Sequence, residues 1–170
     1  MLAFDTALGT CGVTWSEHGI TGVALPGTRG VTRRRAVTPS EMPDTVRETV
    51  AAIIALLDGE HTDLRDVVLD ETGIDPFRRS VYAAARQVPP GATVSYGDIA
   101  RAIGKPDAPR AVGHALGENP YPIIVPCHRV LSATGALHGF SAPGGIATKR
   151  RMLEIERAPG FTQLSLLQAS

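Results

Sequence analysis

The hydrophobic periodicity changes partway along the chain, and this change limits the folds that the chain can adopt. Near the N-terminus apolar and polar residues alternate as in β-strands, at residues 11–15 and again at 20–25. From Asp75 onward apolar residues recur at helical spacing. The sequence therefore predicts an α+β protein with a small strand-rich part, residues 1–73, followed by a mainly helical part, residues 74–170.

Further elements are expected at both ends of the chain. Residues 40–58 carry apolar side chains at helical spacing, and Gly59 follows as a stop signal. The apolar face of this helix is formed by Val46, Val50, Ile53, Ile54 and Leu57. Residues 63–69 are compatible with one more short strand. A last helix is expected at about residues 145–157.

Local start signals define the first helices of the second part. Asp75 followed by proline is an N-cap with proline at the first helical position, and Ser95 with Asp98 resembles a capping box. Another short helix begins at Pro109. Two short helices joined by a tight turn indicate a helix-turn-helix. An ordinary helical hairpin fits the pattern at least equally well.

Neither the composition nor the N-terminus indicates a membrane or secreted protein. The chain has 170 residues and 43% hydrophobic content, which is normal for a globular protein with one ordinary core or two small ones. No apolar run approaches the roughly 20 residues that a spanning helix needs, and no secretion signal opens the chain. A cytoplasmic location without membrane contact is therefore expected.

The zero net charge conceals a difference between the two parts. From Met1 to Asp75 six Lys/Arg stand against twelve Asp/Glu, a net charge of −6. From Pro76 to Ser170 eleven Lys/Arg stand against five Asp/Glu, a net charge of +6. The second part is therefore the one suited to a polyanion such as nucleic acid. Basic patches are also common on ordinary solvated surfaces, so charge alone is weak evidence of nucleic-acid binding.

The two cysteines, Cys11 and Cys127, lie in different surroundings and indicate neither a disulfide framework nor a metal site. Cys11 lies in a strand pattern and is expected in the core. Cys127 follows an extended, proline-flanked segment, residues 121–126, and precedes His128 and Arg129. The residues alone favour a reactive thiol and a buried structural cysteine equally. Contact between the His128 ring and the thiol requires a turn, which adjacent positions do not guarantee.

Motifs of the second part resemble those of a known family. They are Val94-Ser-Tyr-Gly-Asp-Ile-Ala100, Arg110-Ala-Val-Gly113, Asn119-Pro-Tyr-Pro122 and Ile124-Val-Pro-Cys-His-Arg-Val130. Over about residues 75–156 the chain resembles the O6-alkylguanine-DNA alkyltransferases, also called methylated-DNA–protein-cysteine methyltransferases. The resemblance implies a ribonuclease H-like N-terminal domain and a C-terminal domain with a winged-helix-like helix-turn-helix. The implied activity is DNA repair, in which one alkyl group passes irreversibly from O6-alkylguanine to a protein cysteine, with O4-alkylthymine as a further candidate lesion.

The resemblance implies roles for five residues at the reacting centre. Cys127 would be the acceptor, His128 its base through a water molecule, and Glu156 the group that orients the His128 ring. Tyr96 would donate to the departing guanine, and Asn119 would support the site from its Asn-Pro turn. Without the resemblance, Glu156 would be interpreted as a solvated carboxylate at a helix end and Tyr96 as a packing residue.

The resemblance also implies that the second short helix enters the minor groove of duplex DNA and that the damaged nucleotide rotates out of the duplex. Arg110 would fill the gap that the nucleotide leaves. The small residues Ala111, Gly113 and Ala115 would allow close approach to the backbone. The other predicted DNA contacts are Arg101, Lys105 and Arg129, with Arg150 and Arg151 as additional candidates.

The substrate pocket is the site that the sequence defines least well. It is expected to involve Tyr96, Pro122, Val130, Phe140 and Ser141. The loop at residues 139–145 departs from the family pattern, because Phe140 stands where many relatives have tyrosine and the loop is about two residues longer. No cofactor is expected. No metal is expected either, since Cys11, His18 and His61 have spacings unrelated to a ligand set.

Two other functions are compatible with parts of the sequence. A non-catalytic DNA-binding or lesion-binding helix-turn-helix protein would bind without covalent change. A Cys-His hydrolase would turn over acyl substrates but would leave the basic helix unexplained. The Pro-Cys-His-Arg context around Cys127 favours alkyl transfer over both, by a protein expected to act as a monomer.

Overall fold

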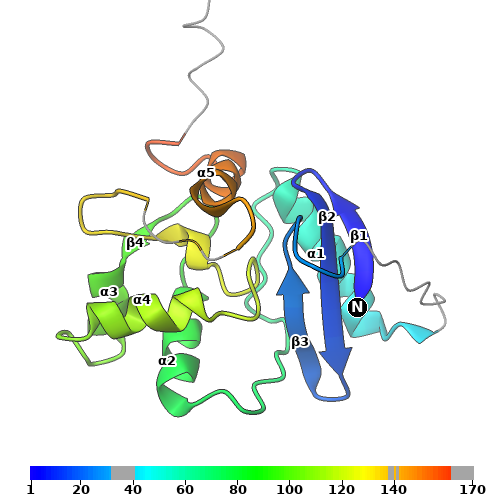
Figure 1. Ribbon diagram of the computed structural model, residues 1–170, viewed down its shortest axis with the longest axis horizontal. Coiled ribbons are helices and arrows are strands. Elements are labelled where there is room, and N and C mark those ends of the chain that lie inside the picture. The colour runs from blue at the N-terminus through cyan, green and yellow to red at the C-terminus, as the bar shows by residue number, and fades with distance from the viewer. Residues whose placement is uncertain (32–40, 138–139, 141, 162–170) are drawn as a thin grey trace, which may run out of the picture.

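The N-terminal part is a three-stranded antiparallel sheet with one helix against it (Figure 1). The computed structural model describes residues 1–31, 41–137, 140 and 142–161. The elements of the first part are β1 (Leu2–Thr6), β2 (Gly9–Ser16), β3 (Gly19–Ala24) and α1 (Asp44–Leu57). The strands follow one another across the sheet in chain order, as the alternating pattern predicts for a hairpin.

Two predictions for this part need correction. Helix α1 begins at Asp44, later than expected, because Pro43 precedes it with an extended backbone and a residue before proline is disfavoured in the helical conformation. The strand expected at residues 63–69 is wrong. Turns bend this segment, which makes only one β-bridge, between Leu69 and Ile20.

The helices of the second part begin at the predicted signals. They are α2 (Pro76–Ala85), α3 (Tyr96–Ala102), α4 (Pro109–Gly117) and α5 (Gly145–Ile155). Asp75 caps α2 by accepting the Arg78 N–H at 3.0 Å, and Ser95 and Asp98 form a reciprocal capping box on α3. Helices α3 and α4 pack on each other and form the predicted helix-turn-helix. No helix in the described ranges is long and apolar enough to cross a bilayer.

A short parallel strand pair joins the helix-turn-helix to the segment that carries Cys127. Strand β4 (Val94–Ser95) pairs with β5 (Val130–Leu131), and the 3-10 turn η2 (Cys127–Arg129) comes directly before β5. Helix α5 contacts η2 and lies above it in Figure 1. The start of α3 and the segment around Cys127 are therefore held side by side.

The two parts share one hydrophobic core. Cys11 of the sheet is fully buried, as expected, and belongs to the same cluster as Val112 of α4 and Val125. At the edge of the sheet the Val23 N–H donates to the carbonyl of Pro120 at 2.9 Å. The division into two domains stays a prediction, because the core runs through both parts.

Candidate active site

A rigid segment carries Cys127 into the interior. The Asn119 side chain closes the turn before it: Oδ1 accepts the Tyr121 N–H at 2.8 Å, and Nδ2 donates to the carbonyl of Val125 at 2.9 Å. Ile123 has a φ of 76°, a left-handed conformation that is costly for a β-branched residue. Such a conformation persists only where the surroundings impose it, so the segment holds the thiol in a fixed position.

The backbone forms a turn at Cys127, which the spacing of Cys127 and His128 in the sequence alone did not guarantee. In η2 the Arg129 N–H donates to the carbonyl of Pro126 at 2.9 Å. The Cys127 residue is 9% exposed and lines a cavity. Burial raises the pKa of the Cys127 thiol, and the Asn119 amide and the charge of Lys149 only partly oppose this. The thiol of the free protein is therefore protonated at neutral pH.

His128, Arg129 and Glu156 form a buried hydrogen-bonded cluster, in which Arg129 and Glu156 are an ion pair. Oε1 of Glu156 lies 2.8 Å from Nε2 of His128 and accepts from Nη2 of Arg129 at 2.8 Å, while Oε2 accepts from Nε of Arg129 at 2.9 Å. Nη1 of Arg129 donates to the carbonyl of Val88 at 2.7 Å. The three side chains are at most 6% exposed. Glu156 is thus an interior ion-pair partner and not a solvated helix-end carboxylate.

This cluster determines the charge state of His128. Burial alone would raise the pKa of the Glu156 carboxyl, but its interactions with His128 and Arg129 outweigh burial and lower it. Burial lowers the pKa of His128 despite the attraction of Glu156. A neutral imidazole therefore donates its Nε2 proton to the carboxylate. Nδ1, which has no hydrogen-bond partner among the described residues, is left as the basic nitrogen.

Since the thiol and the imidazole are both neutral in the free protein, Cys127 should react slowly with a simple electrophile. We expect alkylation of Cys127 by iodoacetamide to be slow at pH 7 and to accelerate about tenfold per pH unit below the raised thiol pKa. Peptide mass spectrometry of samples taken at several pH values measures this rate separately from that of Cys11. A rate that stayed constant from pH 7 down into the acidic range would indicate a preformed thiolate–imidazolium pair.

Lys149 is a candidate functional residue that the sequence analysis missed. Its ammonium group is buried, donates to the carbonyl of Val130 at 2.8 Å and lies 5.9 Å from the ring centroid of Tyr96. Burial lowers the pKa of Lys149 and raises that of the Tyr96 hydroxyl. A signal for Lys149 was present in the sequence, because it shares the buried face of α5 with Met152 and Leu153.

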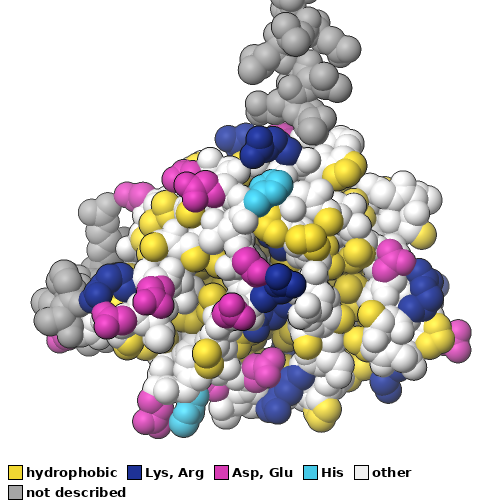
Figure 2. Space-filling model, turned by 180° about the vertical axis from the view of Figure 1, so that it is seen from behind, with side chains coloured by type: hydrophobic (Ala, Val, Ile, Leu, Met, Phe, Trp, Pro, Cys, Tyr) yellow, Lys and Arg dark blue, Asp and Glu magenta, His cyan; other side chains and the backbone are white. Residues whose placement is uncertain are grey.

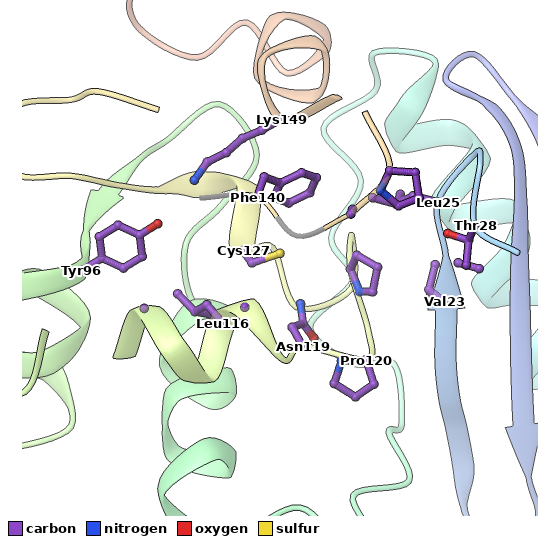
Figure 3. A pocket seen from close by; sticks show the side chains of 16 residues that line it. Val23, Leu25, Thr28, Tyr96, Leu116, Asn119, Pro120, Cys127, Phe140 and Lys149 are labelled. Carbon is purple, nitrogen blue, oxygen red and sulfur yellow. The ribbon is translucent and has the colours of Figure 1, made fainter. Parts of the chain in front are cut away.

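A cavity of about 220 Å³ lies beside the thiol (Figure 3). It is lined by the predicted site residues Tyr96, Gly113, Asn119, Pro122, Cys127 and Phe140, together with Lys149. The prediction for Val130 needs correction: its side chain is fully buried and does not line the cavity, because β5 turns it into the core. Ser141 lies outside the described residues.

The small residues of α4 do not all face the same way. Arg110 and Ala111 are exposed at the start of the helix, and Gly113 lines the cavity next to the Tyr96 ring. Ala115, in contrast, is 2% exposed, and its carbonyl accepts the Tyr82 hydroxyl at 2.8 Å. The expectation that Ala115 approaches DNA is therefore wrong, because this side of α4 packs against α2.

The predicted basic contacts also divide into two kinds. Arg101 is exposed and pairs with Asp98, and exposed Lys105 lies 5.9 Å from the ring centroid of Phe77, so both remain candidates for phosphate contact. Arg129 cannot be a DNA contact. Its guanidinium is buried. Its planar set of N–H donors is used in hydrogen bonds to the Glu156 carboxylate and to the backbone carbonyl of Val88.

Charges of both signs are mixed on the face seen from behind. Figure 2 shows Lys and Arg groups interspersed with Asp, Glu and apolar atoms over the described residues of this face. Arg150 and Arg151 of α5 are exposed, and Arg151 lies 3.9 Å from Glu154. The basic excess of the second part thus forms no continuous patch over the described residues of this face.

Cys11 takes no part in the site. It is free and buried in the core of the sheet, where burial raises the pKa of its thiol. Within the described part of the chain, no group of three His, Cys, Asp or Glu side chains is placed to hold a metal ion.

Sequence comparison relates the chain to DNA repair proteins. Residues 76–158 match the family described as 6-O-methylguanine DNA methyltransferase, DNA binding domain. A methylated-DNA–protein-cysteine methyltransferase of Mycobacterium tuberculosis is 46% identical over 124 residues, which cover 73% of each chain. One from Methanothermobacter thermautotrophicus is 33% identical over 145 residues, which cover 85% of this chain and 78% of the relative.

Solved structures agree with this relationship. Mycobacterium tuberculosis OGT, crystallised in complex with DNA, is 36% identical and superposes with a TM-score of 0.71 over 94% of both chains. The O6-methylguanine-DNA methyltransferase of Pyrococcus kodakaraensis is 33% identical, with a TM-score of 0.62 over 86% of this chain and 90% of that one. The predicted α+β class, a strand-rich part followed by a helical DNA-binding part, is confirmed. The chain therefore belongs to the methylated-DNA–protein-cysteine methyltransferase family.

Proposed function

We propose that this protein repairs DNA by transferring the alkyl group of O6-alkylguanine irreversibly to Cys127. The observation that carries this proposal is a lone thiol on the wall of a cavity, followed directly by a histidine that a buried carboxylate orients. O4-alkylthymine contains the same kind of alkyl–oxygen bond and is a second candidate lesion. The thioether that forms has no good leaving group, so each molecule repairs one lesion.

The transfer is a displacement at the alkyl carbon. His128 takes the thiol proton at Nδ1 through a bridging water, and the thiolate forms the C–S bond as the C–O6 bond breaks. The electron pair of the broken bond stays on guanine, which gains a proton from the Tyr96 hydroxyl; solvent then restores that proton. The buried charge of Lys149 stabilises both the thiolate and the departing base.

Duplex DNA is the proposed partner, because the related Mycobacterium tuberculosis protein was crystallised with DNA. An atom stacked inside a duplex cannot be attacked in place, so the nucleotide must rotate into the cavity. We assign α4 to the minor groove, with Arg110 in the gap and Ala111 against the backbone. Arg101 and Lys105 would contact phosphates, and one protein molecule would act alone.

The intact mass of the protein after incubation with a duplex that contains one O6-methylguanine tests this function. We expect a stoichiometric gain of one methyl group that maps to Cys127 and is absent from a Cys127→Ala variant. Binding of the lesion duplex without a change in mass would instead assign the protein to the non-catalytic lesion-binding class. Continuous release of free methyl product with an unmodified thiol would favour a hydrolase.

Arg110 gives a separate test of the DNA contacts. An Arg110→Ala variant should repair O6-methylguanine in a duplex roughly tenfold more slowly, since rotating a base out of the stack costs a few kcal/mol that an inserted side chain offsets. Repair of the same lesion in a single strand should be unaffected, because no base stack has to be opened. Equal losses on both substrates would show that Arg110 acts in general DNA binding and not in base rotation.

A further inference from the structure

The cavity beside Cys127 extends into the N-terminal part of the molecule. Figure 3 shows Tyr96 on one side of the Cys127 sulfur and Val23, Leu25 and Thr28 on the other. All five residues line one continuous cavity. The region bounded by the last three residues is called the far end of the cavity below. Its position means that the sheet is more than a support for the helical part, since β3 and the turn after it form part of the site.

The loop before α5 contributes Ala142 and Pro143 to the far end. Both residues line the cavity beside the Cys127 thiol. A Cβ atom added at Gly27 would lie 3.1 Å from the Pro143 ring, so the turn after β3 and this loop are in contact. The turn after β3 and the segment with Ala142 and Pro143 therefore meet at the far end.

The chemical character of the far end selects an apolar occupant. The residues that line it include the aliphatic side chains of Val23, Leu25, Ala142 and Pro143, and Thr28 contributes a hydroxyl group. In the proposed function the departing base occupies the side of Tyr96. A methyl group leaves the far end unused, whereas the carbons of a longer alkyl group, beyond the one that reacts, need space past the sulfur.

We infer that the N-terminal part binds the apolar tail of large O6-alkyl groups at the far end of the cavity and thereby determines which lesions are repaired. This inference rests on the proposed function. The reacting step is unchanged: the first carbon of the alkyl group forms the C–S bond, the C–O6 bond breaks, and guanine leaves with the electron pair and gains a proton. The tail stays on Cys127 and remains in the far end.

Filling the far end tests the inference. Single-turnover rates are measured by intact mass for duplexes that contain either O6-methylguanine or O6-butylguanine. In a Thr28→Phe variant we expect the ratio of butyl to methyl transfer to fall about tenfold or more, since one methylene changes discrimination in an apolar pocket by about that factor. An Ala142→Leu variant fills the same space from the other loop and should change the ratio in the same direction. Thermal unfolding of both variants shows whether they fold.

An Arg29→Phe variant is the matched control, because Arg29 is exposed next to Thr28 and does not line the cavity. Its butyl-to-methyl ratio should equal that of the wild type. An unchanged ratio in both filling variants, or a parallel loss of both reactions in variants that fold, would overturn the inference and assign the far end to another part of the DNA. Failure of the proposed function gives a different result, since the wild type would then accept neither alkyl group at Cys127.

Discussion

A Glu156→Gln variant is expected to lose about 3–5 kcal/mol of the free energy of unfolding, the usual cost of leaving one partner of a buried ion pair uncompensated. The amide removes the charge that faces Arg129, whose guanidinium is buried and cannot reach water. It also removes the carboxylate that orients the His128 ring, so alkyl transfer should slow by about 100-fold, within the range for general base catalysis. Urea unfolding and single-turnover kinetics measure the two effects separately.

A Glu154→Gln variant is the matched control for this prediction. Glu154 lies on the same helix, and its carboxylate is 3.9 Å from Arg151 in a partly exposed pair, so its removal should change stability by less than about 1 kcal/mol. Equal effects of the two substitutions would contradict a special role for the buried cluster. Normal transfer in a destabilised Glu156→Gln variant would leave Glu156 with a structural role alone.

The same cluster makes stability depend on pH. The pKa of Glu156 is lower in the folded chain than its ordinary value of 4.5, so its stabilisation is complete above 4.5 and is lost progressively as the pH falls from there toward the lower pKa of the folded state. The lowered pKa of His128 acts with the same sign, because the unfolded chain binds its proton first as the pH falls below 6.5. The wild-type protein should therefore lose stability in acid more steeply than Glu156→Gln. Unfolding at a series of pH values checks this.

A Lys149→Met variant should slow alkyl transfer by about 100-fold or more, the cost of removing one preorganised electrostatic group from a dry site. The side chain of methionine has a similar length, but it brings no charge next to Cys127 and Tyr96. Stability should be kept or raised, since an apolar side chain avoids the cost of burying an ammonium group. Single-turnover kinetics should therefore show slower transfer, while thermal unfolding of the same samples should show unchanged or higher stability.

The control is an Arg151→Met variant on the same helix. Arg151 is exposed, so at saturating DNA concentrations its loss should leave the transfer rate close to that of the wild type. A Lys149→Met variant that transferred methyl at the wild-type rate would show that the lysine only holds the carbonyl of Val130. If the variant instead unfolded readily, the buried ammonium would be a stabilising group and the expectation of unchanged or higher stability would be wrong.

Local sequence signals correctly predicted where helices begin when the capping hydrogen bonds join residues close in the sequence. The cap at Asp75 and the reciprocal box of Ser95 and Asp98 begin α2 and α3 where expected, because these bonds form within a few residues. The strand expected at residues 63–69 failed for the opposite reason. Its apolar residues serve the tertiary core, while Asp63 and Arg65 form a turn that strand periodicity does not reveal.

The site residues that lie in family motifs could be predicted from the sequence. The positions of side chains that depend on tertiary packing could not. Cys127, Tyr96 and Phe140 line one cavity, as their motifs imply. Arg129, in contrast, was predicted as a DNA contact and is buried against Glu156. Its burial depends on Glu156, 27 residues later in the chain, and no local pattern contains that contact.

The pairing of β4 with β5 has a consequence for how such a protein can diversify. Ser95 of β4 comes directly before Tyr96, and Val130 of β5 directly follows η2, so two paired dipeptides set the spacing between the proposed proton donor and Cys127. The loop between β5 and α5 is not part of this strand pair. Its length and composition can therefore change without shifting the reacting groups, which makes it a natural place to graft new segments when variants with altered lesion ranges are evolved in the laboratory.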